Sequence, residues 1–212
     1  MARILSLLLS LLICGLSVAP AWSASPRDDL RAHIEGLLRI AEDRALSAEE
    51  RADRARAVVN SMFDFTSAAP RALGPHWERL TGSQRQAITR MLSGFLTEAV
   101  VARIGYAPRR FADRLRERIA FGGESVDGDR ATVSLTLLRR HENLPVVADM
   151  VRRGTSWRVA DLWLDGVSLV DNYRAQLDRL IRGESYDDMV ERLYTKWETL
   201  IDVDATGETP KR

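Results

Sequence analysis

Cysteine is nearly absent from this sequence. Of its 212 residues only Cys14 is a cysteine, and it lies inside an apolar run close to the N-terminus. A single thiol can form no disulfide within the chain, and the sequence after that run has no thiolate to serve as a nucleophile or a metal ligand. A lipoprotein signal places a small residue before its cysteine, whereas Ile13 stands there, so we do not expect lipidation.

Neither sign of charge is in excess. The chain has 31 Lys and Arg residues against 30 Asp and Glu residues, and Lys196 and Lys211 are its two lysines. This balance argues against nucleic acid as the main partner, because nucleic acid is bound by a basic surface. The segment 103–118 is locally basic. We interpret it as a solvated helix face, with contact to anionic head groups or to an acidic partner as the alternative.

The sequence patterns of common catalytic sites are missing as well. The three histidines are scattered, and His141-Glu142 lacks the second histidine of a zinc-binding helix. The chain has no Gly-x-Ser-x-Gly turn and no phosphate-binding glycine loop. Asp161 is a candidate to pair with Arg174 or Arg158, and we interpret this as an ion pair that fixes the local structure. We therefore expect a protein without enzymatic activity, with no catalytic residue, no metal site and no cofactor.

No apolar run in the chain is long enough to cross a bilayer comfortably. The run from Ile4 to Val18 follows Arg3 and precedes Ala19-Pro20-Ala21, which supplies small residues at the positions that a signal peptidase reads. We predict a Sec-type signal peptide over residues 1–21, with an N-terminal membrane anchor as the alternative. For a bacterial protein, export of this kind leads to the periplasm.

Apolar residues at helical spacing predict helices in the first half of the mature chain. The first covers Asp28 to Leu46, and a capping box of Ser47 with Glu50 begins the second, which runs to about Asn60. The stretch "MFDFTSAAPRALG" continues helically but is interrupted by its proline, and the Gly-Pro pair that follows ends it.

A long helix is predicted from about Gln84 to Ile104. Thr81 and Ser83 are alternative caps for its first turn, because each is followed three residues later by a glutamine. Its apolar face is broad, which indicates that neighbours cover the helix on more than one side.

The period of the apolar residues changes to two in the second half of the chain. A strand is predicted at Ala131, Val133, Leu135 and Leu137, which alternate with polar residues. A hairpin turn at Asp127-Gly128 pairs it with a strand over 117–126. A third strand contains Val146, Ala148 and Met150, and a fourth covers 157–164. The sequence thus predicts an α+β fold, with an antiparallel sheet of about four to five strands packed by N- and C-terminal helices. Residues 22–202 form this single domain, and residues 203–212 are expected to be a disordered tail.

The stretch "WRVADLWLDGVSLVDNYRAQLDRLI", residues 157–181, joins the last strand to a helix. Large apolar side chains alternate on both faces of the strand, so either both faces are covered or a β-bulge switches them. Asp165-Gly166 provides a tight turn, and Ser168 caps the helix with Asp171 at its third position. The joint is predicted to fix the helix against the sheet at a set angle.

This joint resembles the signature of periplasmic lipid carriers of the MlaC type, the toluene-tolerance family. Further stretches agree with that family over nearly all of the mature chain, namely "FDF" at 63–65, "ALGPHW" at 72–77, "SQRQAI" at 83–88, "LPV" at 144–146 and "YDDMVERLYTK" at 186–196. The chain departs from the pattern at Leu177 and Ile88, where the family leads us to expect Phe, and at Ala148, where we expect an aromatic residue. These smaller groups keep a hopanoid-associated branch of the family open.

The resemblance implies a lipid-binding carrier that shuttles phospholipid, or a hopanoid-like lipid, between the outer and inner membranes. It implies two protein partners, an inner-membrane MCE-domain transporter and an outer-membrane lipoprotein complex. The acyl chains are expected in an apolar cavity within the domain, and a bound lipid is the one expected ligand.

The predicted cavity has a sheet wall and a helical wall. The sheet wall consists of Val133, Leu135, Leu137, Val146, Ala148 and Met150, and the helical wall of Leu92, Phe95, Leu96 and Leu177. A non-catalytic interaction module would have the same strand pattern with a filled core in place of the cavity.

Overall fold

The structure, a computed structural model, describes residues 24–105, 116–139, 141–181, 186–188, 190–192 and 195. The predicted signal peptide over 1–21, the predicted tail over 203–212 and most of the basic segment 103–118 lie outside these residues. Within the described part of the chain, no helix combines the length and hydropathy that crossing a bilayer requires.

The described chain has an α+β fold built on one antiparallel sheet. Its five strands follow chain order: β1 (Ile119–Asp127), β2 (Arg130–Leu137), β3 (Leu144–Arg153), β4 (Ser156–Leu164) and β5 (Val167–Ser168). The predicted meander is confirmed. Gly128 and Gly154 form its first and third turns with φ of +58° and +62°, values that favour glycine.

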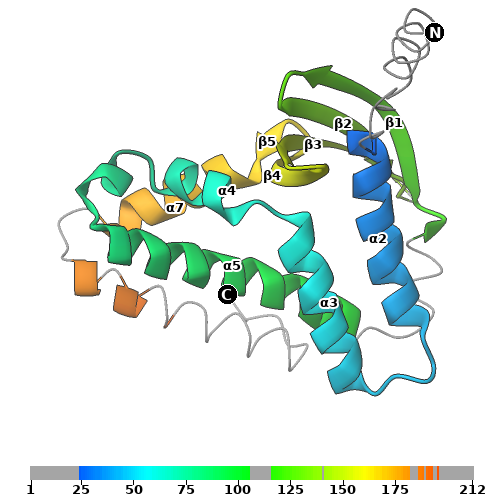
Figure 1. Cartoon of the computed structure of the whole chain (residues 1–212), viewed down its shortest axis with the longest axis horizontal. Helices are drawn as coiled ribbons and strands as arrows, with labels where there is room; N and C mark the ends of the chain where they lie inside the picture. Colours follow the sequence, from blue (N-terminus) through cyan, green and yellow to red (C-terminus); the bar gives the residue numbers. More distant parts are fainter. Residues whose placement is uncertain are drawn as a thin grey trace, which may run out of the picture.

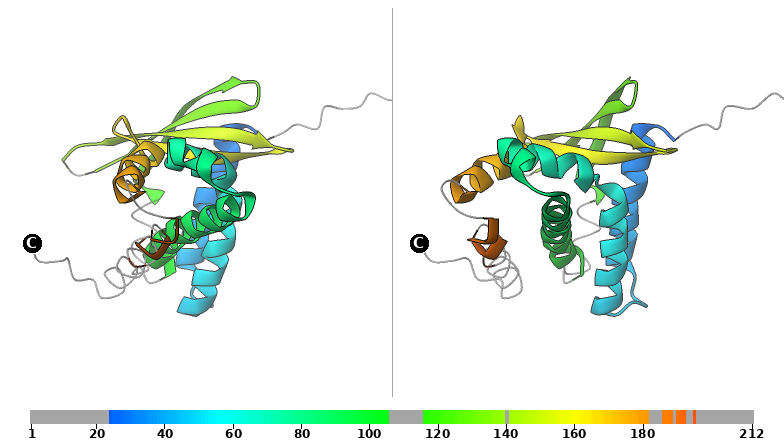
Figure 2. Two further views of the ribbon diagram at one scale, coloured as in Figure 1. Left: turned by 90° about the vertical axis from the view of Figure 1, so that its left-hand side faces the viewer. Right: turned by 60° about the vertical axis from the view of Figure 1, so that its left-hand side comes forward.

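The helices lie together on one side of the sheet (Figures 1 and 2). They are α2 (Pro26–Glu42), α3 (Ala48–Met62), α4 (Phe65–Leu73), the 3-10 helix η1 (Gly74–Arg79), α5 (Gly82–Gly105) and α7 (Leu169–Ile181). Helix α2 packs on β1, β2 and β4, whereas α5 packs on α3, α4 and α2. Helix α5 is therefore held mainly by other helices.

Side-chain caps decide where these helices begin. The predicted capping box is confirmed: the Ser47 amide donates to Glu50 Oε2 at 2.8 Å, and the Glu50 amide donates to Ser47 Oγ at 3.1 Å. Of the two alternatives for α5, Thr81 makes the box with Gln84. Helix α2 begins two residues earlier than predicted, because Ser25 Oγ accepts a hydrogen bond from the Asp28 amide.

The helical prediction was wrong at one joint. The chain does not continue helically from α3 into α4, since Phe63 is extended (φ −99°, ψ 145°) and forms a parallel bridge with Val159. The Asp64 amide then donates to the Val159 carbonyl at 2.8 Å. Pro70, expected as the interruption, lies inside α4. The chain therefore leaves the helix at the point where β4 offers a backbone partner.

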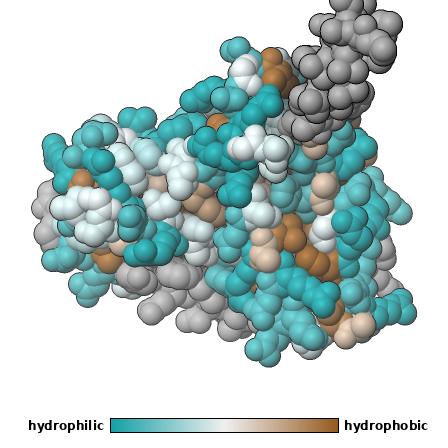
Figure 3. Space-filling view, viewed as in Figure 1, coloured by the Kyte–Doolittle hydropathy of each residue, from teal (hydrophilic) through white to brown (hydrophobic). Residues whose placement is uncertain are grey.

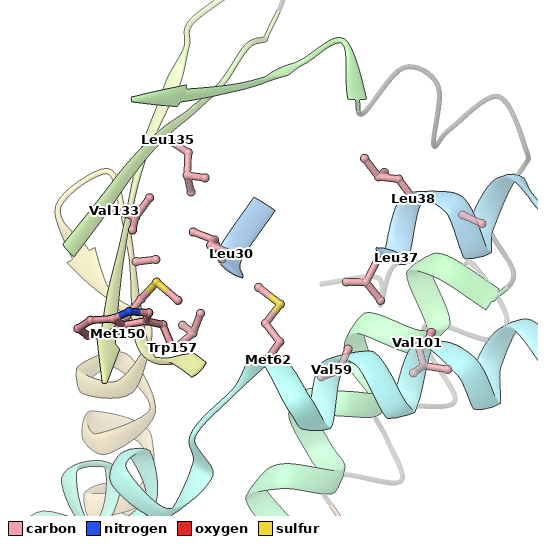
Figure 4. Close-up of a cluster of buried hydrophobic side chains, with 14 of the residues drawn as sticks. Leu30, Leu37, Leu38, Val59, Met62, Val101, Val133, Leu135, Met150 and Trp157 are labelled. Carbon is pink, nitrogen blue, oxygen red and sulfur yellow. The ribbon is translucent and has the colours of Figure 1, made fainter. Parts of the chain in front are cut away.

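The main core fills the space between α2, α3 and the sheet (Figure 4). Its buried side chains include Leu30, Leu38, Val59, Met62, Val133, Met150 and Trp157. The face seen in Figure 3 is mostly hydrophilic, with small hydrophobic groups over the α2–α3 side and in the hollow between α4 and α5.

The turn between β4 and β5 gives a test of the fold. Asp165 and Gly166 both have positive φ, 51° and 76°. Gly166→Val places a β-branched residue in a region it rarely adopts, so we expect the free energy of unfolding to fall by about 1–3 kcal/mol. Urea denaturation measures this change. Gly82→Val, at an open position without positive φ, is the control and should stay within about 0.5 kcal/mol of the parent. If Gly166→Val and Gly82→Val had equal stability, the assignment of positive φ to Gly166 would be wrong.

Candidate functional site

An apolar pocket lies between α4, α5, β4 and α7. It holds about 70 Å³ of water-accessible volume. Its lining residues are Phe63, Asp64, Phe65, Ala68, Ala69, Ala72, Leu92, Phe95, Leu96, Val159, Ala160, Asp161, Leu162, Leu169, Val170 and Tyr173. Almost all of these side chains are hydrocarbon or aromatic, so the pocket suits an apolar ligand.

Each helix contributes one face to the pocket. Phe65, Ala68, Ala69 and Ala72 recur at helical spacing along α4, and the alanines keep that wall thin. Leu92, Phe95 and Leu96 do the same along α5. The Phe95 ring meets Tyr173 of α7 edge-on, with centroids 5.8 Å apart and an interplanar angle of 87°. This aromatic contact joins the α5 wall of the pocket to the α7 wall.

A β-bulge explains why four successive residues of β4 line the pocket. Met150 pairs with Val159, and Asp149 pairs with Asp161, so Ala160 is an extra residue on β4. Val159 before the bulge and Leu162 after it both contact the main core. In a regular strand an odd and an even position would face opposite sides of the sheet, so the bulge has switched the faces. Of the two explanations that the sequence left open, the bulge is therefore present.

Asp161 is buried at this bulge and joins three elements. Its Oδ2 accepts from Ser168 Oγ at 2.6 Å and from Arg71 Nη2 of α4 at 2.9 Å. Its Oδ1 accepts from the amides of Leu162 and Val170 at 2.8 and 3.1 Å. The ion pair that we predicted for Asp161 exists, but its partner is Arg71 and not Arg174 or Arg158.

Arg174 has a different neighbour. Its Nε lies 2.7 Å from the point where a Cβ on Gly74 would stand, and Gly74 has φ of +52°. Because Gly74 has no side chain, the Arg174 guanidinium can occupy that space. Arg71 lies 90 residues before Asp161 in the chain, and a pairing over that distance follows only from the fold.

Asp64 is a second buried carboxylate at the pocket, and it was not among the predicted site residues. It caps α4 by accepting from the amides of Thr66 and Ser67 and from both of their hydroxyls. Arg153 forms an ion pair with its other side. Burial by itself raises the pKa of Asp64, but the hydrogen bonds from Thr66 and Ser67 and the Arg153 guanidinium outweigh it, so the pKa is lowered.

The two carboxylates fix structure and leave little for chemistry. All four of their oxygens already accept hydrogen bonds, so neither is placed to take a proton from a ligand. Among the described residues, no group of three or more His, Cys, Asp or Glu side chains could hold a metal ion. The site is therefore an apolar pocket, and the two buried carboxylates beside it have all of their hydrogen-bond partners within the protein.

The predicted cavity residues fall into two sets. Leu92, Phe95 and Leu96 line the pocket. The remaining seven do not: Val133, Leu135, Ala148 and Met150 belong to the main core, Val146 packs against it, Leu137 is half-buried at the end of β2, and Leu177 packs with Ala72 and Val170. Helices α2 and α3 cover the sheet face that we expected to be open. Whether any of the ten residues contacts a lipid stays a prediction.

The sequence-based prediction did not include the pocket wall that α4 contributes. Its signal is the spacing of Phe65, Ala68, Ala69 and Ala72, an i, i+3, i+4, i+7 pattern that is apolar but built mostly from alanine. Alanine adds little to hydropathy, and thus the pattern is weak in the sequence.

Comparison with known proteins supplies a family and a fold. The family model described as "MlaC protein" matches residues 32–195. A search of curated proteins finds no match. Among solved structures, a phospholipid-binding protein from Ralstonia solanacearum, determined in complex with a phospholipid, is similar at 17% identity with a TM-score of 0.65. The match covers 84% of this chain and 99% of that protein, which establishes a shared fold.

The ion pair at Asp64 predicts a pH-dependent stability. Because the folded-state pKa is lowered, the charged form stabilises the fold above the unfolded pKa of about 3.9, and this contribution is lost as pH falls through the folded pKa. We expect Asp64→Asn to lower the free energy of unfolding by about 2–4 kcal/mol at pH 7. The difference from the parent should shrink below about pH 4.

Urea denaturation of parent and variant from pH 3 to 8 measures this dependence. Asp53→Asn is the matched control, because Asp53 pairs with Arg56 but is 67% exposed. Its effect should stay below about 1 kcal/mol at all pH values. A loss for Asp64→Asn that is small at pH 7, or constant over the whole range, would contradict the assignment.

Proposed function

The chain belongs to the MlaC protein family, and from this membership together with the apolar pocket we propose that it is a lipid-binding carrier. The pocket between α4, α5, β4 and α7 receives the acyl chains of a phospholipid. The single observation that carries this proposal is the pocket's lining, which is apolar apart from the Tyr173 hydroxyl and two carboxylates that are both fully hydrogen-bonded.

The physical case for a carrier rests on the insolubility of acyl chains. Each methylene group gains about 0.8 kcal/mol on leaving water, so a free phospholipid crosses an aqueous compartment very slowly. A carrier must shield the chains and still release them. Walls of Leu, Phe and Ala meet both needs, because contacts with them are non-directional and are exchanged for lipid contacts without breaking hydrogen bonds.

Loading must widen the pocket. A volume of about 70 Å³ is far below the roughly 300–1,000 Å³ typical of sites for small organic ligands. The Ralstonia protein of the same fold was determined in complex with a phospholipid, which supports the view that this architecture accommodates one.

The biological route follows the family. We propose that the mature protein works in the periplasm after removal of residues 1–21, and that it carries phospholipid between the outer and inner membranes. An outer-membrane lipoprotein complex and an inner-membrane MCE-domain transporter are the proposed partners. The near-neutral chain agrees with a protein that must leave each membrane surface again.

The alternative readings have less support. Ile88, Ala148 and Leu177, whose small size kept a hopanoid-like lipid open, pack in apolar clusters and do not line the pocket. The filled core expected of an interaction module does exist between α2, α3 and the sheet. It lies beside the pocket, however, and does not replace it.

Organic extraction of the purified full-length protein, followed by lipid mass spectrometry, tests the proposal. We expect phospholipid in an amount close to that of the protein, with two acyl chains per molecule. Protein that contains no lipid and also takes up none from phospholipid vesicles would overturn the carrier function. A hopanoid as the main extracted lipid would identify the alternative ligand.

The pocket itself is tested by Leu96→Arg. Leu96 is half-buried, lines the pocket and belongs to none of the packed clusters. An arginine stem can lie along the pocket wall while its guanidinium reaches water, so the protein should stay folded. We expect its co-purifying lipid to fall at least about threefold, since the new charge occupies the space of an acyl chain. Lipid mass spectrometry and circular dichroism melting measure the two properties.

Two further variants serve as controls for Leu96→Arg. Val126→Arg introduces the same charge at a residue that is 49% exposed, and both its lipid content and its melting temperature should match the parent. Leu135→Arg puts the charge into the packed core, where Leu135 is 9% exposed, and should destabilise by several kcal/mol. Normal lipid content in Leu96→Arg would show that the acyl chains lie elsewhere.

A further inference from the structure

A polar crevice lies next to the apolar pocket. It runs between α3 and α5 and has a volume of about 390 Å³. Phe65 lines both spaces. On α5, Leu92 and Leu96 face the pocket while Ser93 and Thr97, one residue further along, face the crevice. The two spaces therefore adjoin, and the Phe65 ring stands at the border between an apolar and a polar environment.

One arginine of the crevice has no acidic partner. Arg56 does have such partners: it donates through Nε and Nη2 to the two carboxylate oxygens of Glu98, at 2.6 and 3.1 Å, and through Nη1 to Asp53 at 2.6 Å. Arg90 lines the same crevice, is exposed, and has no acidic partner among the described residues. Its guanidinium offers a planar set of donors that matches the oxygens of a phosphate group.

The neutral side chains of the crevice also leave donors unused. Asn60 Oδ1 accepts from Ser93 Oγ at 3.3 Å and from Thr97 Oγ1 at 3.2 Å. Both oxygen lone pairs of the amide are thereby engaged, and its NH₂ group has no partner among the described residues. Thr97 is 3% exposed, which fixes this end of the network. An acceptor in the crevice would meet donors from Asn60 and Arg90.

We propose that this crevice binds the phosphate group of a phospholipid whose acyl chains occupy the adjoining pocket. The inference rests on the proposed carrier function. An anion compensates the unpaired charge of Arg90 and accepts from the Asn60 amide, while Phe65 contacts the start of the chains. The crevice then selects lipids by head group, which the apolar pocket cannot do.

The test compares two lipids with identical acyl chains. Delipidated protein is incubated with vesicles that contain equal amounts of phosphatidylglycerol and of diacylglycerol, which lacks the phosphate, and the protein-bound lipids are quantified by mass spectrometry. We expect the parent to enrich phosphatidylglycerol. Arg90→Glu should lower the bound ratio at least about threefold, and Arg90→Lys should restore part of it because the charge is kept.

Controls separate this proposal from the carrier function. Arg44→Glu makes the same change of net charge at an exposed site away from the crevice and should leave the ratio unchanged. Because Arg90 is exposed, its variants should fold normally, which circular dichroism melting checks. An unchanged total with an unchanged ratio would overturn the head-group site alone. Loss of all lipid binding in the parent would overturn the carrier function.

A second measurement distinguishes a lipid phosphate from a free one. Delipidated parent and Arg90→Glu are titrated with inorganic phosphate and followed by isothermal titration calorimetry. Weak binding in the parent that disappears in the variant, together with the changed lipid ratio, supports the lipid head group as ligand. If phosphate binding depends on Arg90 but the lipid ratio does not, the crevice is a site for free phosphate and the head-group assignment is wrong.

Discussion

The buried carboxylate of Asp161 is the constraint on which the arrangement of this protein depends. An ionised carboxylate without partners inside a protein is unfavourable by several kcal/mol. Asp161 avoids this penalty through its hydrogen bonds from Ser168, which caps α7, from the Val170 amide and from Arg71 of α4. Asp161 thus ties both α4 and α7 to β4, and the pocket forms between the elements that it joins.

Much of the fold followed from local patterns in the sequence. Alternation along β2 and β3, the glycine turns and the Ser47–Glu50 capping box are features of neighbouring residues, and the structure contains all of them. The break at Phe63 was not predictable in this way. It exists because Val159, almost a hundred residues later, offers a backbone partner. The Arg71–Asp161 pair escaped prediction for the same reason.

The candidate site was harder to predict because filled core and open pocket use the same residue types. Val133 and Leu135 on the sheet have the hydropathy of cavity residues, yet α2 and α3 cover them. Ala68 and Ala72 on α4 have low hydropathy, yet they line the pocket. Which apolar face remains uncovered is decided by how helices pack, and periodicity along a single element carries no information on that choice.

The unequal attachment of α4 has a consequence for motion. Hydrogen bonds and ion pairs from Asp64 and Arg71 tie α4 to the sheet, whereas α5 is tied to α3 through Glu98 and Asn60. Among the described residues, no hydrogen bond joins α4 to α5; only apolar contacts do. The contact between α4 and α5 is therefore an apolar seam inside one packed domain. Widening this seam breaks no hydrogen bond between the two helices. In the carrier that we propose, an entering acyl chain replaces the lost apolar contacts with its own, so the hydrogen bonds around Asp64 and Asp161 stay intact during loading and release.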